Sequence, residues 1–303
     1  MVTFAQQLLN GLTIGSFYSF VALGYSLVYA IMKLINFAHG DLFALGSYIA
    51  YSLLVYSAAL LTSHFGLWGA LAVATIVSAI SVAVFGILME RVAYRPIYPA
   101  GRLPAVVSAL GMSIFLENAI MAVWGPRLLA YHASFIPTGY WKIADFRISV
   151  LQVTILLGAF ILLSGLYYVV EKTTFGAAVR ATALDRDTAA LMGVDFNKVI
   201  LFVFTVGPAL GAVAGVMVGL YYRQINFTMG WNYGLKAFTA TILGGIGNIP
   251  GAMIGGLLLG VVEALSAGYI STAWKDVITF CVLMLMLIFR PTGLLGEKIA
   301  EKV

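Results

Sequence analysis

The chain has 303 residues, of which 62% are hydrophobic and 10% are charged, with a formal net charge of +5. Soluble domains carry about a quarter charged residues and under half apolar ones, so this chain lacks the polar material to cover a soluble globule. Its mean hydropathy of +1.00 indicates a polytopic membrane protein. Its basic residues form no cluster, which argues against a nucleic-acid partner. A single cysteine excludes a disulfide framework and a cysteine-based metal site.

Apolar runs recur along the chain, and a bilayer core needs about 20 apolar residues for each helix. The first run lacks a basic flank and a small-residue cleavage site, so we expect it to be retained. Spans are expected at 8–31, 42–63, 65–89, 103–124, 148–170 and 199–222, with a longer apolar region at 237–268 and a last span that ends near Phe289. The fold class is an all-α polytopic membrane protein with about eight membrane-spanning or re-entrant helical segments, some broken, in one domain over 1–303.

The sequence INFAHGDLFALG (35–46) separates the first two runs. It places Asn36, His39 and Asp41 within six residues, with Gly40 between the last two. One interpretation is a polar turn at the membrane interface, where Asp41 caps the next helix. The other is a discontinuous helix whose termini and polar side chains line a solute path. The residues alone leave both open.

Two further acidic residues, Glu117 and Glu263, lie inside apolar runs. Acids within a membrane are candidate functional residues, and burial beside a polar partner in a structural role is the alternative. A proton relay built on Asp41, Glu117 or Glu263 would make the chain a self-sufficient ion-coupled transporter.

The sequence GGIGNIPG (244–251) interrupts the long apolar region. Proline with several glycines breaks a helix, so two shorter elements are expected there. Non-helical backbone at membrane depth persists only beside protein or a water-lined cavity. We therefore expect this break to face 36–41 across a cavity. The candidates it adds to the solute path are Gly244, Gly245, Gly247, Asn248 and Pro250.

Lysine and arginine gather at 90–102, at 171–198 and in the tail after Phe289. The positive-inside rule places these three segments in the cytoplasm, which puts the C-terminus inside and the N-terminus outside. Residue 64 and segment 125–147 are then outside, although 125–147 also carries three basic residues.

Small residues recur every four positions at Gly207, Gly211, Gly215 and Gly219, and the pairs Gly11/Gly15, Gly251/Gly255 and Gly256/Gly260 repeat the spacing. In lipid this spacing lets helix backbones approach closely. We interpret the 207–219 series as helix packing.

Segment 171–198 is too charged to span a membrane. From Gly176 to Leu191 its composition favours a helix, and Gly193 is placed as a stop. A short cytoplasmic helix there would either dock onto a partner or serve as a solvated connector.

No catalytic constellation is present, because the three histidines are far apart and no nucleophile or metal-protease pattern occurs. The chain also has no P-loop, so any ATP hydrolysis must come from another chain. The sequence predicts that the protein is not an enzyme and that it has no catalytic or metal site.

Five segments in order resemble the H-type permease subunits of branched-chain amino-acid ABC importers, the leucine-isoleucine-valine systems. They are INFAHGDLFALGSY (35–48), ERVAYRP (90–96), ALGMSIFLEN (109–118), KAFTATILGGIGNIPGAMIGG (236–256) and RPTGLLG (290–296). The resemblance covers essentially the whole chain. Permeases of the same family for urea and short amides share much of the NFAHG pattern, so such a substrate is an alternative.

The resemblance implies an importer subunit in a bacterial or archaeal plasma (inner) membrane that moves a branched-chain or other neutral hydrophobic amino acid inward. The implied partners are a second permease (a paralogue or a copy of this chain), two cytoplasmic ATP-binding subunits, an extracytoplasmic substrate-binding protein and membrane lipid. This chain would bind no cofactor, since ATP and Mg²⁺ belong to the ATPase subunits.

The loop 176–193 is similar to the coupling segment of such permeases, which contacts the ATP-binding subunit. Ala181, Ala189 and Leu191 are then candidates for the buried contact. Polar anchors at its rim would be Arg180, Asp185 and Asp187, and Gly176 and Gly193 would bracket the helix.

Overall fold

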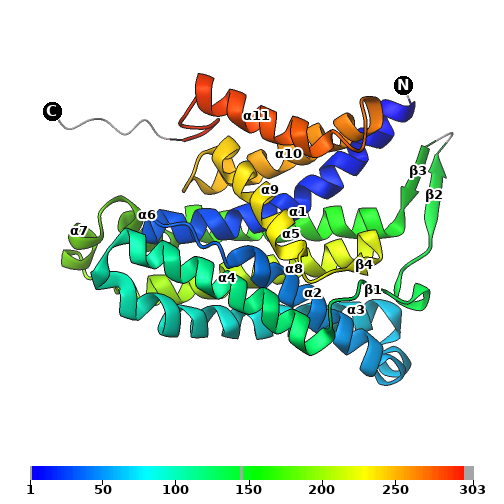
Figure 1. The fold of residues 1–303 in the computed structure, drawn as a ribbon, viewed down its shortest axis with the longest axis horizontal. Helices are drawn as coiled ribbons and strands as arrows, with labels where there is room; N and C mark the ends of the chain where they lie inside the picture. The colour runs from blue at the N-terminus through cyan, green and yellow to red at the C-terminus, as the bar shows by residue number, and fades with distance from the viewer. Residues whose placement is uncertain (1, 144–145, 297–303) are drawn as a thin grey trace.

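The computed structural model describes residues 2–143 and 146–296 (Figure 1). It is a bundle of helices with two small antiparallel strand pairs, β1 with β4 and β2 with β3. The helices are α1 (Val2–Met32), α2 (His39–Tyr56), α3 (Ala58–Met89), α4 (Arg102–Trp124), α5 (Val150–Lys172), α6 (Thr174–Leu184), α7 (Arg186–Leu191), α8 (Phe196–Tyr222), α9 (Met229–Gly244), α10 (Ile249–Tyr269) and α11 (Lys275–Phe289). The strands are β1 (Leu129–Ala130), β2 (Tyr140–Ile143), β3 (Phe146–Ser149) and β4 (Gln224–Ile225). The predicted all-α class is confirmed.

Within the described residues, six helices are long and apolar enough to cross a membrane: Phe4–Met32, Leu61–Tyr98, Leu103–Trp124, Val150–Lys172, Phe196–Tyr222 and Ile249–Tyr269. The chain is therefore a multi-pass membrane protein. α2 ends at Tyr56 and α3 begins at Ala58, so the first of these two spans ends earlier than expected. The expected boundary near residue 64 does lie close to a helix break, because Gly66 leaves the helical conformation inside α3 with a backbone φ of +65°.

α1 lies at the centre of the bundle and contacts α8, α9 and α10. Glycines let α1 and α10 approach closely, because a Cβ on Gly15 would lie 2.7 Å from the Cα of Leu257 and one on Gly11 would lie 2.7 Å from the Cα of Val261. The 207–219 series is also a packing surface, as predicted. A Cβ on Gly219, for example, would lie 2.8 Å from Ser47 Oγ of α2.

The connection between α1 and α2 folds back into the bundle. α1 ends at Met32, yet α2 begins at His39, whose ring lies against Gly24 of α1. Gly24 is eight residues before the end of α1, which corresponds to about 12 Å along a helix. α2 therefore starts inside the bundle, and 33–38 is a true break in the helical path. Of the two interpretations of 35–46, the structure supports the discontinuous helix.

The loops separate into two groups at opposite ends of the bundle (Figure 1). The start of α1, the α2–α3 turn and the β2–β3 hairpin lie at one end. α6, α7 and the end of α11 lie at the other, with the connection between α3 and α4. This second group holds the basic segments that we expect in the cytoplasm. The last residues of the expected cytoplasmic tail, 297–303, lie outside the described residues.

We expect the end with α6 and α7 to be cytoplasmic. In a Cys281→Ser background, Leu184→Cys should react with an impermeant thiol reagent only after the membrane is permeabilised, because Leu184 is exposed at the end of α6, outside the membrane spans. Tyr140→Cys, exposed on β2 at the opposite end, should react in intact cells. Labelling of position 184 in intact cells would show that the topology is the reverse.

Candidate functional site

The break at 36–41 places three polar side chains in the interior: Asn36, His39 and Asp41 are each at most 1% exposed. Two of them accept hydrogen bonds from other elements. Ser113 Oγ of α4 donates to Asp41 Oδ2 at 2.5 Å, and the Tyr94 hydroxyl donates to Asn36 Oδ1 at 2.6 Å. These bonds connect the segment 35–48 with the segments 90–96 and 109–118.

The same three side chains also carry buried atoms without a hydrogen-bond partner among the described residues. These atoms are Asp41 Oδ1, Asn36 Nδ2 and, apart from an interaction of the His39 ring with the Val21 backbone, both ring nitrogens of His39. The His39 ring packs against Gly24 and lies edge-on to Tyr25, with ring centroids 5.0 Å apart. Unsatisfied polar atoms are costly to bury, and several in one place mark a site rather than a core.

Glu117 belongs to the same region. It lies one helical turn after Ser113 on α4, partly buried, and is near enough to Asp41 for their charges to interact. The structure thus brings together Asp41 and Glu117, which are far apart in the sequence.

The element opposite 36–41 is α9. A Cβ on Gly40 would meet the carbonyl oxygen of Gly230 and would lie 3.0 Å from the Cα of Gly234. The expectation that 244–251 faces 36–41 is therefore wrong, because the first two turns of α9 occupy that place.

The break at 244–251 instead joins the C-terminal segment. Asn248 caps α10 by accepting from the Gly251 amide at 2.7 Å, and it donates to the Leu295 carbonyl at 2.9 Å. The amide of Leu295 in turn donates to the Gly244 carbonyl at 2.9 Å. Gly245 and Gly247 adopt positive φ angles in this turn, and Pro250 lies in the first turn of α10. These contacts describe a packed turn.

Glu263 lies in a separate cluster of charges. Its carboxylate accepts from the Tyr18 hydroxyl at 2.5 Å and from Lys236 Nζ at 2.8 Å, and Lys275 Nζ is 3.3 Å away. Lys236 also pairs with Asp276 at 2.7 Å. Two acids and two bases therefore compensate one another and connect α9, α10 and α11. Of the two interpretations of Glu263, this geometry fits the structural one.

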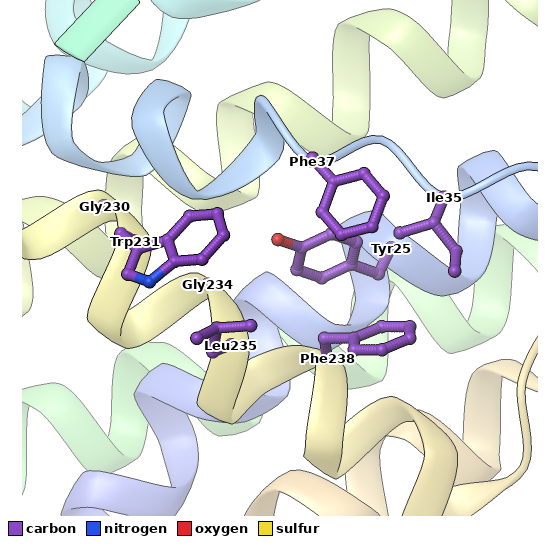
Figure 2. Close-up of a pocket in the computed structure, with 8 residues that line it drawn as sticks. All are labelled: Tyr25, Ile35, Phe37, Gly230, Trp231, Gly234, Leu235 and Phe238. Carbon is purple, nitrogen blue, oxygen red and sulfur yellow. The ribbon is translucent and has the colours of Figure 1, made fainter. Parts of the chain in front are cut away.

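A pocket opens beside the break (Figure 2). It lies between the 33–38 connection and α9, and its free volume in this structure is about 10 Å³, so a side chain can enter only when these elements move apart. Its lining consists of Tyr25, Ile35, Phe37, Gly230, Trp231, Gly234, Leu235 and Phe238. We call it the aromatic pocket. No charged side chain lines it, so it suits an aliphatic group.

A second pocket, with a cavity volume of about 120 Å³, adjoins the other side of the first turn of α9. We call it the tyrosine pocket. It is lined by Val218, Tyr222, Gln224, Ile225, Asn226, Met229 and Tyr233. Met229 and Gly230, neighbours in the chain, thus line different pockets.

The expected coupling helix at 176–193 is two helices. Asp185 leaves the helical conformation and caps α7, accepting from the amides of Asp187 and Thr188. Aspartate at an N-cap satisfies free amides, which explains the interruption. Gly176 does not bracket the segment, because it is buried in the first turn of α6 against the Val170 carbonyl. Gly193, with a φ of +85°, ends it as predicted.

The side chains of this segment divide into packed and exposed ones. Arg180 donates to the Val170 carbonyl and is 3.6 Å from Glu171, so it anchors α6 to α5. Ala189 is 4% exposed and is already covered by this chain, whereas Ala181 is half-buried. Leu184, Leu191 and Met192 are at least 79% exposed. Of the three residues expected to form the buried contact with a partner, only Leu191 presents a large free surface.

Four residues of this region were not predicted from the sequence as site residues: the polar partners Ser113, Tyr94 and Lys236, and the pocket-lining Trp231. For Lys236 a signal existed, since a basic residue within an apolar run is as unusual as an acidic one. Among the described residues, no group of three or more histidine, cysteine, aspartate or glutamate side chains is placed to hold a metal ion.

The Glu263 cluster gives a prediction. Lys236→Met should destabilise the protein by about 3 kcal/mol, since it removes one of the two lysine partners of the buried Glu263 carboxylate. Adding Glu263→Gln to Lys236→Met should recover part of the lost free energy of unfolding, because the charge that has lost a lysine partner is removed. Thermal unfolding in detergent measures both, with Lys198→Met, which alters an exposed ion pair, as the control. Equal stability of Lys236→Met and the control would contradict the structural interpretation of this cluster.

Comparisons with known proteins agree with this architecture. The family model of the branched-chain amino acid transport system / permease component matches residues 7–287. The chain is 43% identical to the high-affinity branched-chain amino acid transport system permease protein LivH of Escherichia coli (strain K12) and 44% identical to BraD of Pseudomonas aeruginosa, in each case over 99% of this chain and 98% of the relative.

A third relative, the probable branched-chain amino acid transport permease protein LivM of Methanocaldococcus jannaschii, is 32% identical over 42% of this chain and 41% of its own length. No solved structure matches the chain. The extent of the family match and the identity to full-length relatives show that the chain belongs to the branched-chain amino acid transport permease family.

Proposed function

We propose that this protein is a permease subunit of an ATP-binding-cassette importer for branched-chain aliphatic amino acids. The observation that carries the proposal is the match of residues 7–287 to the permease family, together with relatives named as high-affinity branched-chain amino acid permeases. The direction of transport is inward, and the energy comes from ATP hydrolysed by partner chains.

The aromatic pocket favours this substrate over urea and short amides. Its six large lining side chains are aromatic or aliphatic, which suits a branched hydrocarbon and offers little to a small polar amide. Of the three acids considered for a proton relay, Glu263 fits that role least, because Lys236 and Lys275 already compensate its charge.

The partners follow from the two ends of the bundle. Two ATP-binding subunits would dock at the end that carries α6 and α7, where apolar side chains are exposed. An extracytoplasmic binding protein would approach the end with the β2–β3 hairpin. The second permease would be a related chain, and the partial match to a LivM-type permease supports a paralogue.

Transport in proteoliposomes tests the function. The chain, reconstituted with its ATPase, binding-protein and permease partners, should take up labelled L-leucine only when ATP is present, and unlabelled urea in excess should not compete. Uptake by this chain alone without nucleotide would favour the ion-coupled transporter. Competition by urea would favour the amide permease.

Docking of the ATPase gives a second prediction. Leu191→Asp should reduce the ATPase retained on the purified permease by about tenfold, because an apolar contact would acquire a charge. Leu191 is 87% exposed, so the permease itself should remain folded. Tyr140→Asp, an equally polar change at the opposite end, is the control. If the Leu191→Asp permease retains as much ATPase as the wild type, the docking surface lies elsewhere, and 90–96 is the next candidate.

A further inference from the structure

The break at 35–40 has a second copy in the sequence. Residues 35–40 read INFAHG and residues 225–230 read INFTMG, so both are Ile-Asn-Phe-x-x-Gly. Each copy follows a long helix and precedes a short one: α1 and α2 flank the first, and α8 and α9 flank the second. The second copy lacks charged residues.

The two copies adopt the same local structure. The amide of His39 donates to the Asn36 carbonyl at 3.0 Å, and the amide of Met229 donates to the Asn226 carbonyl at 3.2 Å. The residues before the two short helices, Ala38 and Thr228, share a helical backbone conformation, and neither caps its helix with a side chain. A shared sequence thus gives two equivalent breaks, each followed by an uncapped helix N-terminus.

The two copies have opposite directions in the bundle (Figure 1). α1 runs from the end with the β2–β3 hairpin toward the end with α6, and α8 runs the other way. α2 and α9 then depart in opposite directions as well. Inverted pairs of broken helices that meet inside a membrane are typical of transporter binding sites.

The copies meet at their glycines. A Cβ on Gly230 would lie 2.8 Å from the Gly40 carbonyl oxygen and 2.9 Å from the Cα of Asp41, so the two backbones touch. The first turns of α2 and α9 are therefore adjacent. Free amides at helix N-termini attract anionic groups, and two such termini lie together here.

Asp41 supplies the opposite charge at the same place. Its Oδ1 points at the first turn of α9, since a Cβ on Gly230 would lie 2.5 Å from this atom. The side chain is 1% exposed, and none of the other described residues donates a hydrogen bond to Oδ1. None of the ion pairs among the described residues includes Asp41, and Lys236 is already paired with Glu263 and Asp276.

We propose that Asp41 and the first turn of α9 form a subsite for the charged head group of an α-amino acid. Asp41 Oδ1 accepts from the ammonium group, and the uncapped amides of α9 donate to the carboxylate. The aliphatic side chain lies in the aromatic pocket, whose lining shares Gly230 and Trp231 with this turn. This subsite rests on the proposed function and specifies which residues recognise the substrate.

The subsite also lies between the two pockets, because the first turn of α9 separates the aromatic pocket from the tyrosine pocket. The contact of Gly40 with Gly230 closes it in this structure. Substrate entry therefore requires α9 to move away from α2. Because both contacting residues are glycines, no side chains interlock at this contact and hold the two helices together.

Binding of labelled L-leucine to the purified membrane complex, without the binding protein, tests the subsite. Asp41→Asn keeps the shape of the side chain and removes its charge, and it should weaken leucine binding by at least about tenfold while the complex still assembles. The control is Asp195→Asn, an exposed N-cap of α8 at which asparagine caps equally well. Leucine binding by Asp41→Asn within about twofold of wild type would overturn the subsite.

Analogues provide a measurement that needs no variant. Isocaproate is leucine without its ammonium group, and isoamylamine is leucine without its carboxylate. Each should displace labelled leucine from the wild-type complex at least about tenfold less well than leucine does. Displacement by isocaproate as effective as by leucine would overturn the contact with Asp41. Failure of the wild-type complex to transport leucine would instead contradict the proposed function.

Discussion

Gly40 and Gly230 touch at the point where two interrupted helices begin, and this backbone crossing determines the arrangement around it. Non-helical backbone inside a membrane must be enclosed by protein, because lipid satisfies none of its polar groups. Here each break is enclosed partly by the other. A side chain at either position would collide with the facing backbone, so only glycine permits the approach. The same crossing places Asp41 against α9 and opens the aromatic pocket beside it.

Charge compensation distinguishes the two buried acids. Glu263 has two lysine partners and a tyrosine donor, so its charge is balanced within the chain. Asp41 has one serine donor and an unpartnered oxygen beside a nearby second acid. Both acids are embedded in apolar sequence, and the sequence does not distinguish them because their partners lie elsewhere in the chain. The compensated acid connects the helices of the bundle, and the uncompensated one is the acid that we propose for the ammonium group of the substrate.

Much of the fold could be predicted from the sequence, since long apolar runs and glycine spacing are local signals. The break at 36–41 was predictable because charge inside an apolar run is rare. Its counterpart at 225–230 carries no charge, and only a search for internal repeats would have revealed it. The partners of Glu263 were not predictable, since Tyr18 is 245 positions away. The split of 176–193 depends on Asp185 capping a helix, a choice that helix propensity alone does not show.

We propose above all that the first turn of α9 borders the path of the substrate. The most direct test of this proposal is the reactivity of Trp231→Cys, in a Cys281→Ser background, toward a water-soluble thiol reagent during the transport cycle. In the assembled complex, reactivity should differ between the nucleotide-free and ATP-trapped states, and L-leucine should protect the residue in the reactive state. Equal reactivity in both states without protection by leucine would place the path elsewhere in the bundle.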